Sequence, residues 1–185
     1  MAVCVLDTEC TGFAGDSRAS VIELGAVVLT DDGNEMAAFN TLVQPTYPVG
    51  AWCRRAMEVN QIDPKLLMYA PEPEVVWDAF LAWLSLHKPV KTVYAFNVSF
   101  DQRIMQQTFP VSEHLPWGPC LMRDANQLLF DSRKSIKLEA AARGFGLTVP
   151  RLGFHRALFD ARLAGQLYQQ MCKDRRYSPG HGARL

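Results

Sequence analysis

The chain has 185 residues, of which 49% are hydrophobic, and this suits one globular domain with a substantial core. Its 19 basic and 19 acidic side chains balance, which excludes the strongly basic character of a protein that coats duplex nucleic acid. An acid at the seventh residue argues against a signal peptide, and no apolar run reaches membrane-spanning length. The five cysteines show no metal-binding spacing, so we expect reduced thiols in a soluble, cytoplasmic protein.

The first half of the chain is predicted to open with a β meander. Residues 2–7 form a nearly continuous apolar run, which is typical of a strand buried on both faces. Residues 20–30 predict a second strand, and a turn at 31–34 leads into a third strand within 35–45. The Pro-punctuated region 47–73 is expected to hold one or two short helices.

Helices and strands alternate in the second half. In chain order, we predict a helix at 73–87, a strand at 90–96, a helix at 100–109 capped by Ser99, a short strand leading into a helix at 120–130, a helix at 135–146 and a last helix at about 156–173. This order predicts one α/β domain over 1–173, with a mixed central sheet flanked by helices. The basic segment 174–185 is predicted to be a flexible tail.

Asp160 lies on the apolar side of the last predicted helix. Ala164, Leu167 and Met171 follow it at spacings of four, three and four, which keeps all of them on one helix face. A carboxylate that faces a core must be paired, hydrogen-bonded, protonated or bound to a metal. The sequence therefore has to contain a partner for Asp160.

Three further acids lie at comparable positions. Asp7 and Glu9 close the first strand two residues apart, so both side chains leave the same face, although such a pair alone would more simply be a strand running into solvent. Asp101 begins a predicted helix directly after another strand. Four carboxylates in one cleft would repel one another and raise their pKa values. Because oxygen-only ligands suit Mg²⁺ or Mn²⁺, two such ions about 3.5 to 4 Å apart would neutralise the four acids.

His155 is predicted to lie in the loop before the last helix, since five residues is a poor helical spacing from Asp160. A histidine with an ordinary pKa of about 6.5 can accept a proton from water at neutral pH. The alternative is a loop histidine that takes no part in chemistry.

Three segments resemble the motifs of the DEDDh exonucleases, the family that includes polymerase proofreading subunits, ribonuclease T and oligoribonuclease. They are VLDTECTGF (5–13), YAFNVSFD (94–101) and HRALFDARLAG (155–165), and the likeness covers nearly all of 3–172. The resemblance implies a ribonuclease-H-like fold and hydrolysis from the 3′ end that releases nucleoside 5′-monophosphates. By the same resemblance Asp7, Glu9, Asp101 and Asp160 correspond to the metal-binding acids and His155 to the general base, with Glu9 also near the terminal 3′-hydroxyl.

Candidates for binding the terminal nucleotides lie in or near these motifs. They are Thr8, Cys10, Gly12, Phe13, Ile62, Phe96 and Asn97. Phe13, Ile62 and Phe96 could pack against bases, because aromatic stacking tolerates any sequence. Core packing explains Phe13 equally well and is the favoured explanation for Ile62 and Phe96.

The chain departs from the family pattern at three places around the chemical residues. Cys10 stands where a threonine is frequent, Phe96 where a histidine is frequent, and 60–62 (NQI) where His-Gly-Ile is frequent. None of these differences touches the four acids or His155. They bear on the pocket for the terminal nucleotide.

We therefore expect a metal-dependent 3′–5′ exonuclease that acts on single-stranded DNA or RNA 3′ ends, with DNA slightly favoured. The resemblance implies two divalent ions, Mg²⁺ or Mn²⁺, and in-line attack by water with His155 as general base. One alternative is an exoribonuclease that trims short RNA or RNA 3′ ends. Another is an inactive binding module, although such a module should have lost one of the five residues. Without an appended polymerase-binding domain we expect a free-standing enzyme; its oligomeric state is open, with a homodimer as one alternative.

Overall fold

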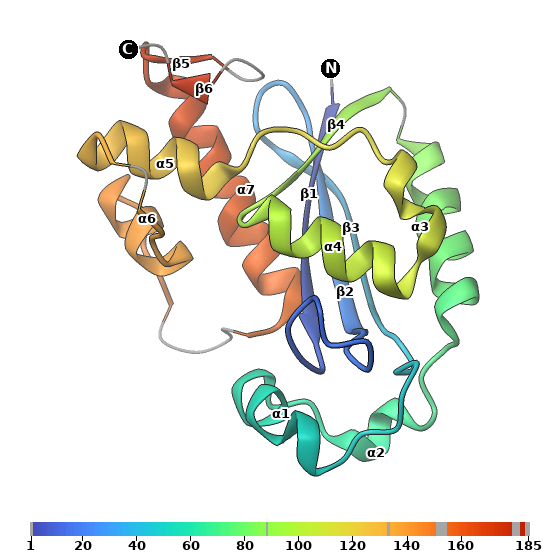
Figure 1. The fold of residues 1–185 in the computed structure, drawn as a ribbon. Coiled ribbons are helices and arrows are strands. Elements are labelled where there is room, and N and C mark those ends of the chain that lie inside the picture. The colour runs from blue at the N-terminus through green and yellow to red at the C-terminus, as the bar shows by residue number, and fades with distance from the viewer. Residues whose placement is uncertain (1, 88, 133, 151–154, 179–181, 184–185) are drawn as a thin grey trace.

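The computed structural model describes residues 2–87, 89–132, 134–150, 155–178 and 182–183 (Figure 1). Its centre is a four-stranded sheet of β1 (Ala2–Cys10), β2 (Val21–Leu29), β3 (Glu35–Leu42) and β4 (Val90–Ala95). The strands lie in the order β3-β2-β1-β4, with β1 antiparallel to β2, parallel to β4, and β2 antiparallel to β3. The predicted meander and mixed sheet are confirmed.

Helices fill most of the remaining chain. They are α1 (Arg54–Asn60), α2 (Pro64–Leu67), α3 (Pro73–Leu86), α4 (Val98–Thr108), α5 (Leu121–Phe130), α6 (Leu138–Gly144) and α7 (Ala157–Lys173), with 3-10 turns η1 (Ala51–Cys53) and η2 (Pro110–His114). The short helices α1 and α2 are those expected between 47 and 73. None of the described helices has the length and apolar character needed to cross a membrane.

Two local predictions are wrong. The segment 120–130 holds α5 and no strand, because its buried residues Leu121, Ala125 and Leu128 recur at helical spacing. The sheet contact comes earlier, as an isolated parallel bridge between Val93 and Trp117.

The cap predicted for α4 is also displaced. The backbone N–H groups of Phe100 and Asp101 donate to the carbonyl of Asn97, so the helix starts at Val98, two residues earlier than predicted. Asn97 is the N-cap residue, and Ser99 lies inside the first turn without capping it.

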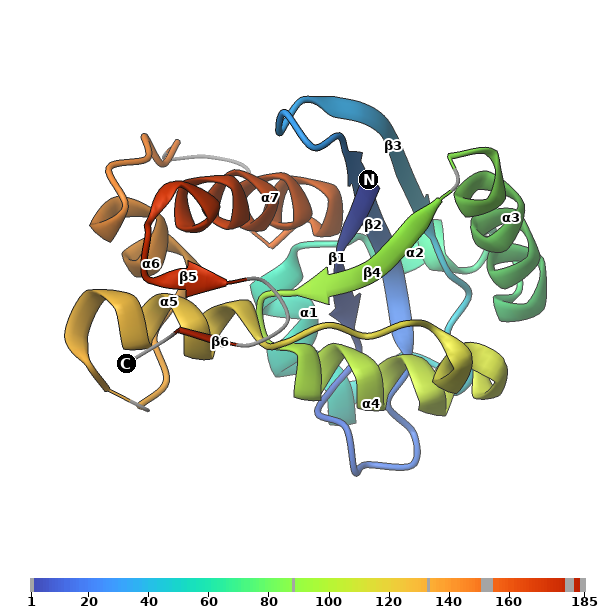
Figure 2. The ribbon, with the colours of Figure 1, turned by 90° about the horizontal axis from the view of Figure 1, so that it is seen from above.

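Different helices cover the two faces of the sheet (Figure 2). Along β1, Leu6 belongs to the core shared with α3 and α4, whereas Val5 belongs to the core shared with α5, α6 and α7. This alternation follows from the pleat of a strand. Asp7 and Glu9 continue the series of Val5 and therefore face α7.

The carboxyl end of β1 extends past its neighbour β4. The parallel ladder ends at Leu6 and Ala95, while pairing of β1 with β2 continues to Cys10. Within the described chain, the last four residues of β1 are thus paired on the β2 side alone. Acids at 7 and 9 therefore lie where α4 and α7 can approach from different sides.

The predicted flexible tail over 174–185 is only partly within the described residues. Tyr177 is buried, and its ring centroid lies 6.5 Å from that of Tyr168 on α7. The two-residue strand β5 (Tyr177–Ser178) pairs antiparallel with β6 (Gly182–Ala183). The chain therefore stays packed on the domain through Ser178.

Candidate active site

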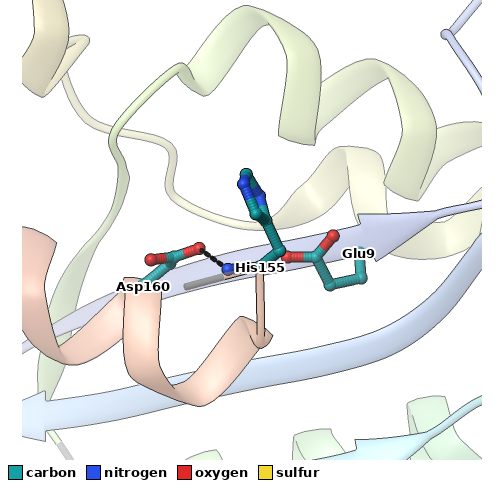
Figure 3. A group of neighbouring side chains, drawn as sticks. All are labelled: Glu9, His155 and Asp160. Carbon is teal, nitrogen blue, oxygen red and sulfur yellow. Dashed lines mark hydrogen bonds between the residues drawn. The ribbon is translucent and has the colours of Figure 1, made fainter. Parts of the chain in front are cut away.

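Glu9, His155 and Asp160 meet where the start of α7 crosses β1 (Figure 3). One carboxylate oxygen of each acid and one imidazole nitrogen of His155 all lie within 4.8 Å of one another. Asp160 is in the first turn of α7, and Glu9 is near the end of β1. The residues thus come from opposite ends of the sequence, as the motif spacing required.

Asp160 is held by one oxygen only. Its Oδ2 accepts the backbone N–H of His155 at 3.1 Å. Its Oδ1 is buried and has no hydrogen-bond partner among the described residues. A buried carboxylate oxygen without a donor is costly, so this atom fits a cation ligand.

Asp101 reaches the same region from α4. It is 3% exposed, and its Oδ1 accepts the hydroxyl of Thr8 at 2.9 Å. Since Thr8 lies between Asp7 and Glu9 on β1, this bond ties the first turn of α4 to the strand that carries two of the acids. Asp101 therefore has a fixed position against β1, where its charge raises the pKa values of Asp7 and Glu9.

Burial raises the pKa of all four acids, and for Asp7 and Glu9 the charges of other site acids add to the shift. Burial raises the pKa of Asp7 well above its usual value, and the charges of Asp101 and Asp160 raise it further. Burial likewise raises the pKa of Glu9 to about 8, that of Asp101 to about 7 and that of Asp160 to about 6. Among neighbouring charges, Asp160 contributes most to the shift of Glu9. The site holds more negative charge than it can stabilise by itself.

The donor set suits a hard divalent cation. The four acids offer only oxygen, the ligand type that Mg²⁺ and Mn²⁺ prefer, and the unpartnered Oδ1 of Asp160 is already desolvated. Divalent ions are also the counter-charge that would lower the raised pKa values. The residues present therefore fit the metal ions that the sequence predicts.

His155 has a special backbone conformation. Its φ of 61° is in the left-handed region, which a residue other than glycine adopts only when its surroundings hold it there. The side chain is exposed, so the imidazole can reach solvent and substrate. The predicted loop position ahead of α7 is confirmed.

The candidates for nucleotide binding divide into exposed and buried residues. Phe13 is 78% exposed, which rules out core packing for it, and Asn97 is exposed beside the start of α4. Thr8, Ile62 and Phe96 are all buried, at 6%, 6% and 8% exposure. Ile62 and Phe96 belong to the core, as the sequence favoured, and Thr8 is engaged with Asp101.

Cys10, the last residue of β1, and Gly12, in the loop that follows, are both half-buried. Asn60, one of the departures from the family pattern, is buried and donates its side-chain amide to the carbonyl of Cys10 at 3.2 Å. Its Oδ1 accepts the backbone N–H of Ile62. Asn60 therefore joins α1 to the end of the strand that carries the acids.

Sequence analysis missed one further acid, Glu23 on β2. It lies directly across from Glu9 in the antiparallel ladder and is 1% exposed, paired with Arg156. The signal was available, since an acid inside the apolar run of the second strand poses the same question as Asp160.

A family model described as an exonuclease, RNase_T, matches residues 4–168, which is most of the chain. The chain belongs to this family. It is therefore an exonuclease-family domain, and the three motifs that resemble those of DEDDh exonucleases lie within the matched residues. Metal ions are implied by that membership.

Two relatives are polymerase proteins of bacteria. The DNA polymerase III subunit epsilon of Aquifex aeolicus is 27% identical over 178 residues, covering 96% of this chain and 84% of the relative. The PolC-type DNA polymerase III of Bacillus cereus is 27% identical over 180 residues, covering 92% of this chain. This chain spans only 11% of the PolC-type protein.

Solved structures share the fold at lower identity. The nuclease domain of 3′hExo, a DEDDh family member bound to rAMP, superposes with a TM-score of 0.79 at 15% identity, covering 98% of this chain and 96% of that one. A zinc-bound complex of E. coli ExoI with single-stranded DNA gives 0.70 at 16% identity, covering 92% and 40%. The ribonuclease-H-like fold predicted from sequence is thereby confirmed.

Proposed function

We propose that this exonuclease domain removes nucleoside 5′-monophosphates from the 3′ ends of single-stranded DNA, using two divalent ions and His155 as general base. The observation that carries the proposal is the gathering of Glu9, His155 and Asp160 within 4.8 Å, with the second oxygen of Asp160 buried and unpartnered among the described residues. A site of this kind has the ligands and the base that phosphodiester hydrolysis needs.

The chain's own residues have separate tasks in this reaction. Asp7, Glu9, Asp101 and Asp160 would hold the ions, and Glu9 would also lie near the terminal 3′-hydroxyl. When bound, the ions would neutralise these acids and stabilise the negative charge that develops on the phosphate. His155 would take the proton from the attacking water at an imidazole nitrogen, since its side chain is exposed and its backbone N–H is the group that binds Asp160.

The strand would be held without recognition of base identity. Phe13 projects from the loop after β1 with most of its ring in solvent, so a terminal base could stack on it. Asn97, exposed at the start of α4, could donate to the sugar or phosphate. Cys10 and Gly12, which lie between the acids and Phe13 in the chain, would line the pocket for the terminal nucleotide.

DNA is the proposed substrate because the two sequence relatives described above are DNA polymerase III proteins. The likeness to the epsilon subunit also suggests that a polymerase is a partner, in place of the free-standing enzyme expected from sequence. RNA remains the second candidate, since one structural neighbour is described as recognising the 3′ end of a histone mRNA stem-loop.

The test is a time course on 5′-labelled single-stranded DNA and RNA of equal sequence, with Mg²⁺, Mn²⁺ or chelator. The proposal predicts a ladder that shortens from the 3′ end, faster on DNA, absent with chelator and slowed by a 3′-phosphate. Faster shortening of RNA would support the exoribonuclease alternative. Cutting of a circular single strand would contradict exonuclease action altogether.

A further inference from the structure

We infer that Glu23 and Arg156 form a clamp that positions His155, and that they act on the rate of the proposed reaction through this histidine. The inference rests on the proposed function. The clamp consists of these two side chains, one on β2 and one directly before α7. Neither residue touches the reacting atoms in this account, so both are positioning residues.

Glu23 binds the start of α7 through several hydrogen bonds. Arg156 donates to it with Nε at 3.0 Å to Oε2 and with Nη2 at 2.7 Å to Oε1. The backbone N–H of Ala157, the first residue of α7, donates to Oε2 at 3.1 Å. Asn40 on β3 completes the set by donating to Oε1 at 3.2 Å. A bidentate pair with further donors fixes direction as well as distance.

The clamp also offsets the repulsion between two acids that face each other on adjacent strands. Glu9 and Glu23 are direct neighbours across the ladder and point to the same face of the sheet. Like charges opposite one another destabilise a sheet, and Arg156 supplies the compensating positive charge. The carboxylate of Glu23 additionally lies at the N-terminus of a 17-residue helix, where negative charge is favoured.

His155 is held by contacts of its own backbone and of the two residues that follow it. Its own N–H donates to Asp160, and the next two residues are bound to Glu23 by a side chain and by a backbone N–H. The backbone at His155 has a φ of 61°, which is unfavourable unless the flanking residues are fixed. Loss of the clamp should therefore displace the imidazole of His155 more readily than it disrupts α7.

The chain contains a matched control on the same helix. Arg162 pairs with Glu35 of β3 with the same geometry, Nε at 3.0 Å and Nη2 at 2.7 Å from the carboxylate oxygens. Glu35 is exposed and its partner lies on the solvent side of α7, whereas Glu23 is 1% exposed. The two ion pairs have the same geometry, but only Glu23–Arg156 is adjacent to His155.

The experiment measures kcat and KM on 5′-labelled single-stranded DNA at saturating Mn²⁺. Glu23→Gln and Arg156→Lys should each lower kcat about tenfold and change KM less than threefold, because neither amide nor ammonium reproduces the bidentate pair. Glu35→Gln and Arg162→Lys should match wild type. Arg156→Lys leaves every other bond of Glu23 in place and gives the result if Glu23→Gln does not fold.

The decisive comparison repeats Glu23→Gln in a His155→Ala background. If the clamp acts through the imidazole, the second substitution should lower kcat less than twofold further. A full tenfold loss in that background would overturn the inference, as would wild-type kcat in both clamp variants. A rise in KM alone would also overturn it, because Arg156 would then be a phosphate contact.

An inactive wild type would overturn the proposed function and the inference together, whereas the other outcomes leave the proposed function intact.

Discussion

In several residues of the site, one group is fixed by a hydrogen bond while another group of the same residue has no described partner or is exposed. Asp160 accepts a backbone N–H with Oδ2, while its Oδ1 is buried without a described partner. Asp101 accepts the hydroxyl of Thr8, and the backbone of His155 is fixed while its side chain is exposed. This division keeps the site rigid and leaves it polar atoms that a ligand could bind.

Replacement of His155 by alanine should lower kcat by about a hundredfold or more, the usual effect of losing a general base. Binding of Mn²⁺, measured by calorimetry, should be almost unchanged, since the carboxylates remain. His114→Ala, an exposed histidine in η2 beyond the other end of α4, should leave kcat at the wild-type value. Near-normal turnover of His155→Ala at neutral pH would remove this residue from the mechanism.

The sequence predicted the four acids and His155 because each breaks a local pattern. Asp160 interrupts an apolar helix face, and Asp7 with Glu9 closes a buried strand. It did not predict the pairing of Glu23 with Arg156, which is 133 residues away in the chain. Such pairing depends on which helix lies on which strand, and no local period carries that information.

At the scale of elements, the site depends on how closely α7 lies on β2. A Cβ built at Gly25 would be 2.2 Å from the backbone nitrogen of Leu158 and 2.3 Å from the carbonyl carbon of Ala157. Only glycine permits this approach of strand and helix backbones. Gly25 is the ladder partner of Asp7, so the same contact places the first turn of α7 beside the acids of β1.

Gly25→Ala should therefore destabilise the domain by about 2 kcal/mol or more, since neither backbone can yield to the added methyl group. Chemical denaturation of the metal-free protein measures this change. Gly50→Ala is the matched control: its φ of −165° is ordinary extended backbone, and the nearest atom to its Cβ is a side-chain carbon of Trp52 at 3.6 Å. Equal stability of the two variants would contradict the close packing of α7 on β2.

Most elements were predicted from apolar periodicity, and the two errors lie at the starts of α4 and α5. Only two residues separate β4 from α4, and Asn97, not Ser99, is the N-cap residue. The segment 120–130 begins with apolar residues that suit a strand, yet its burial follows a helical period. Local sequence does not decide such cases, because the pairing partner is remote.

The whole molecule carries the electrostatic cost of the site when no cation is bound. Glu9, Asp101 and Asp160 have pKa values of about 8, 7 and 6, against ordinary values near 4. Between about pH 4 and pH 8 the folded protein therefore holds protons that the unfolded chain has released. By linkage, the free energy of unfolding falls as pH rises through this window.

The metal-free protein should accordingly have a lower melting temperature at pH 8 than at pH 5, as measured in the presence of chelator. Saturating Mn²⁺ should remove most of this fall, because the cations replace the protons. Asp16 and Asp174, whose pKa values are lowered to about 2 by their arginine partners, change charge below this window and do not contribute. A melting temperature that rises from pH 5 to pH 8 in chelator would contradict the shared acidic site.

The most direct test of a shared metal site is the shift in melting temperature that Mn²⁺ produces in wild type and in Asp160→Asn. Binding to the folded state at a hundredfold excess over Kd contributes about 2.7 kcal/mol, so Mn²⁺ should raise the wild-type melting temperature by several degrees. Asp160→Asn should leave the metal-free protein at least as stable as wild type and shrink the shift, while Asp78→Asn on the exposed side of α3 should do neither. An undiminished shift in Asp160→Asn, or no shift in wild type at millimolar Mn²⁺, would show that the four acids do not form one metal site.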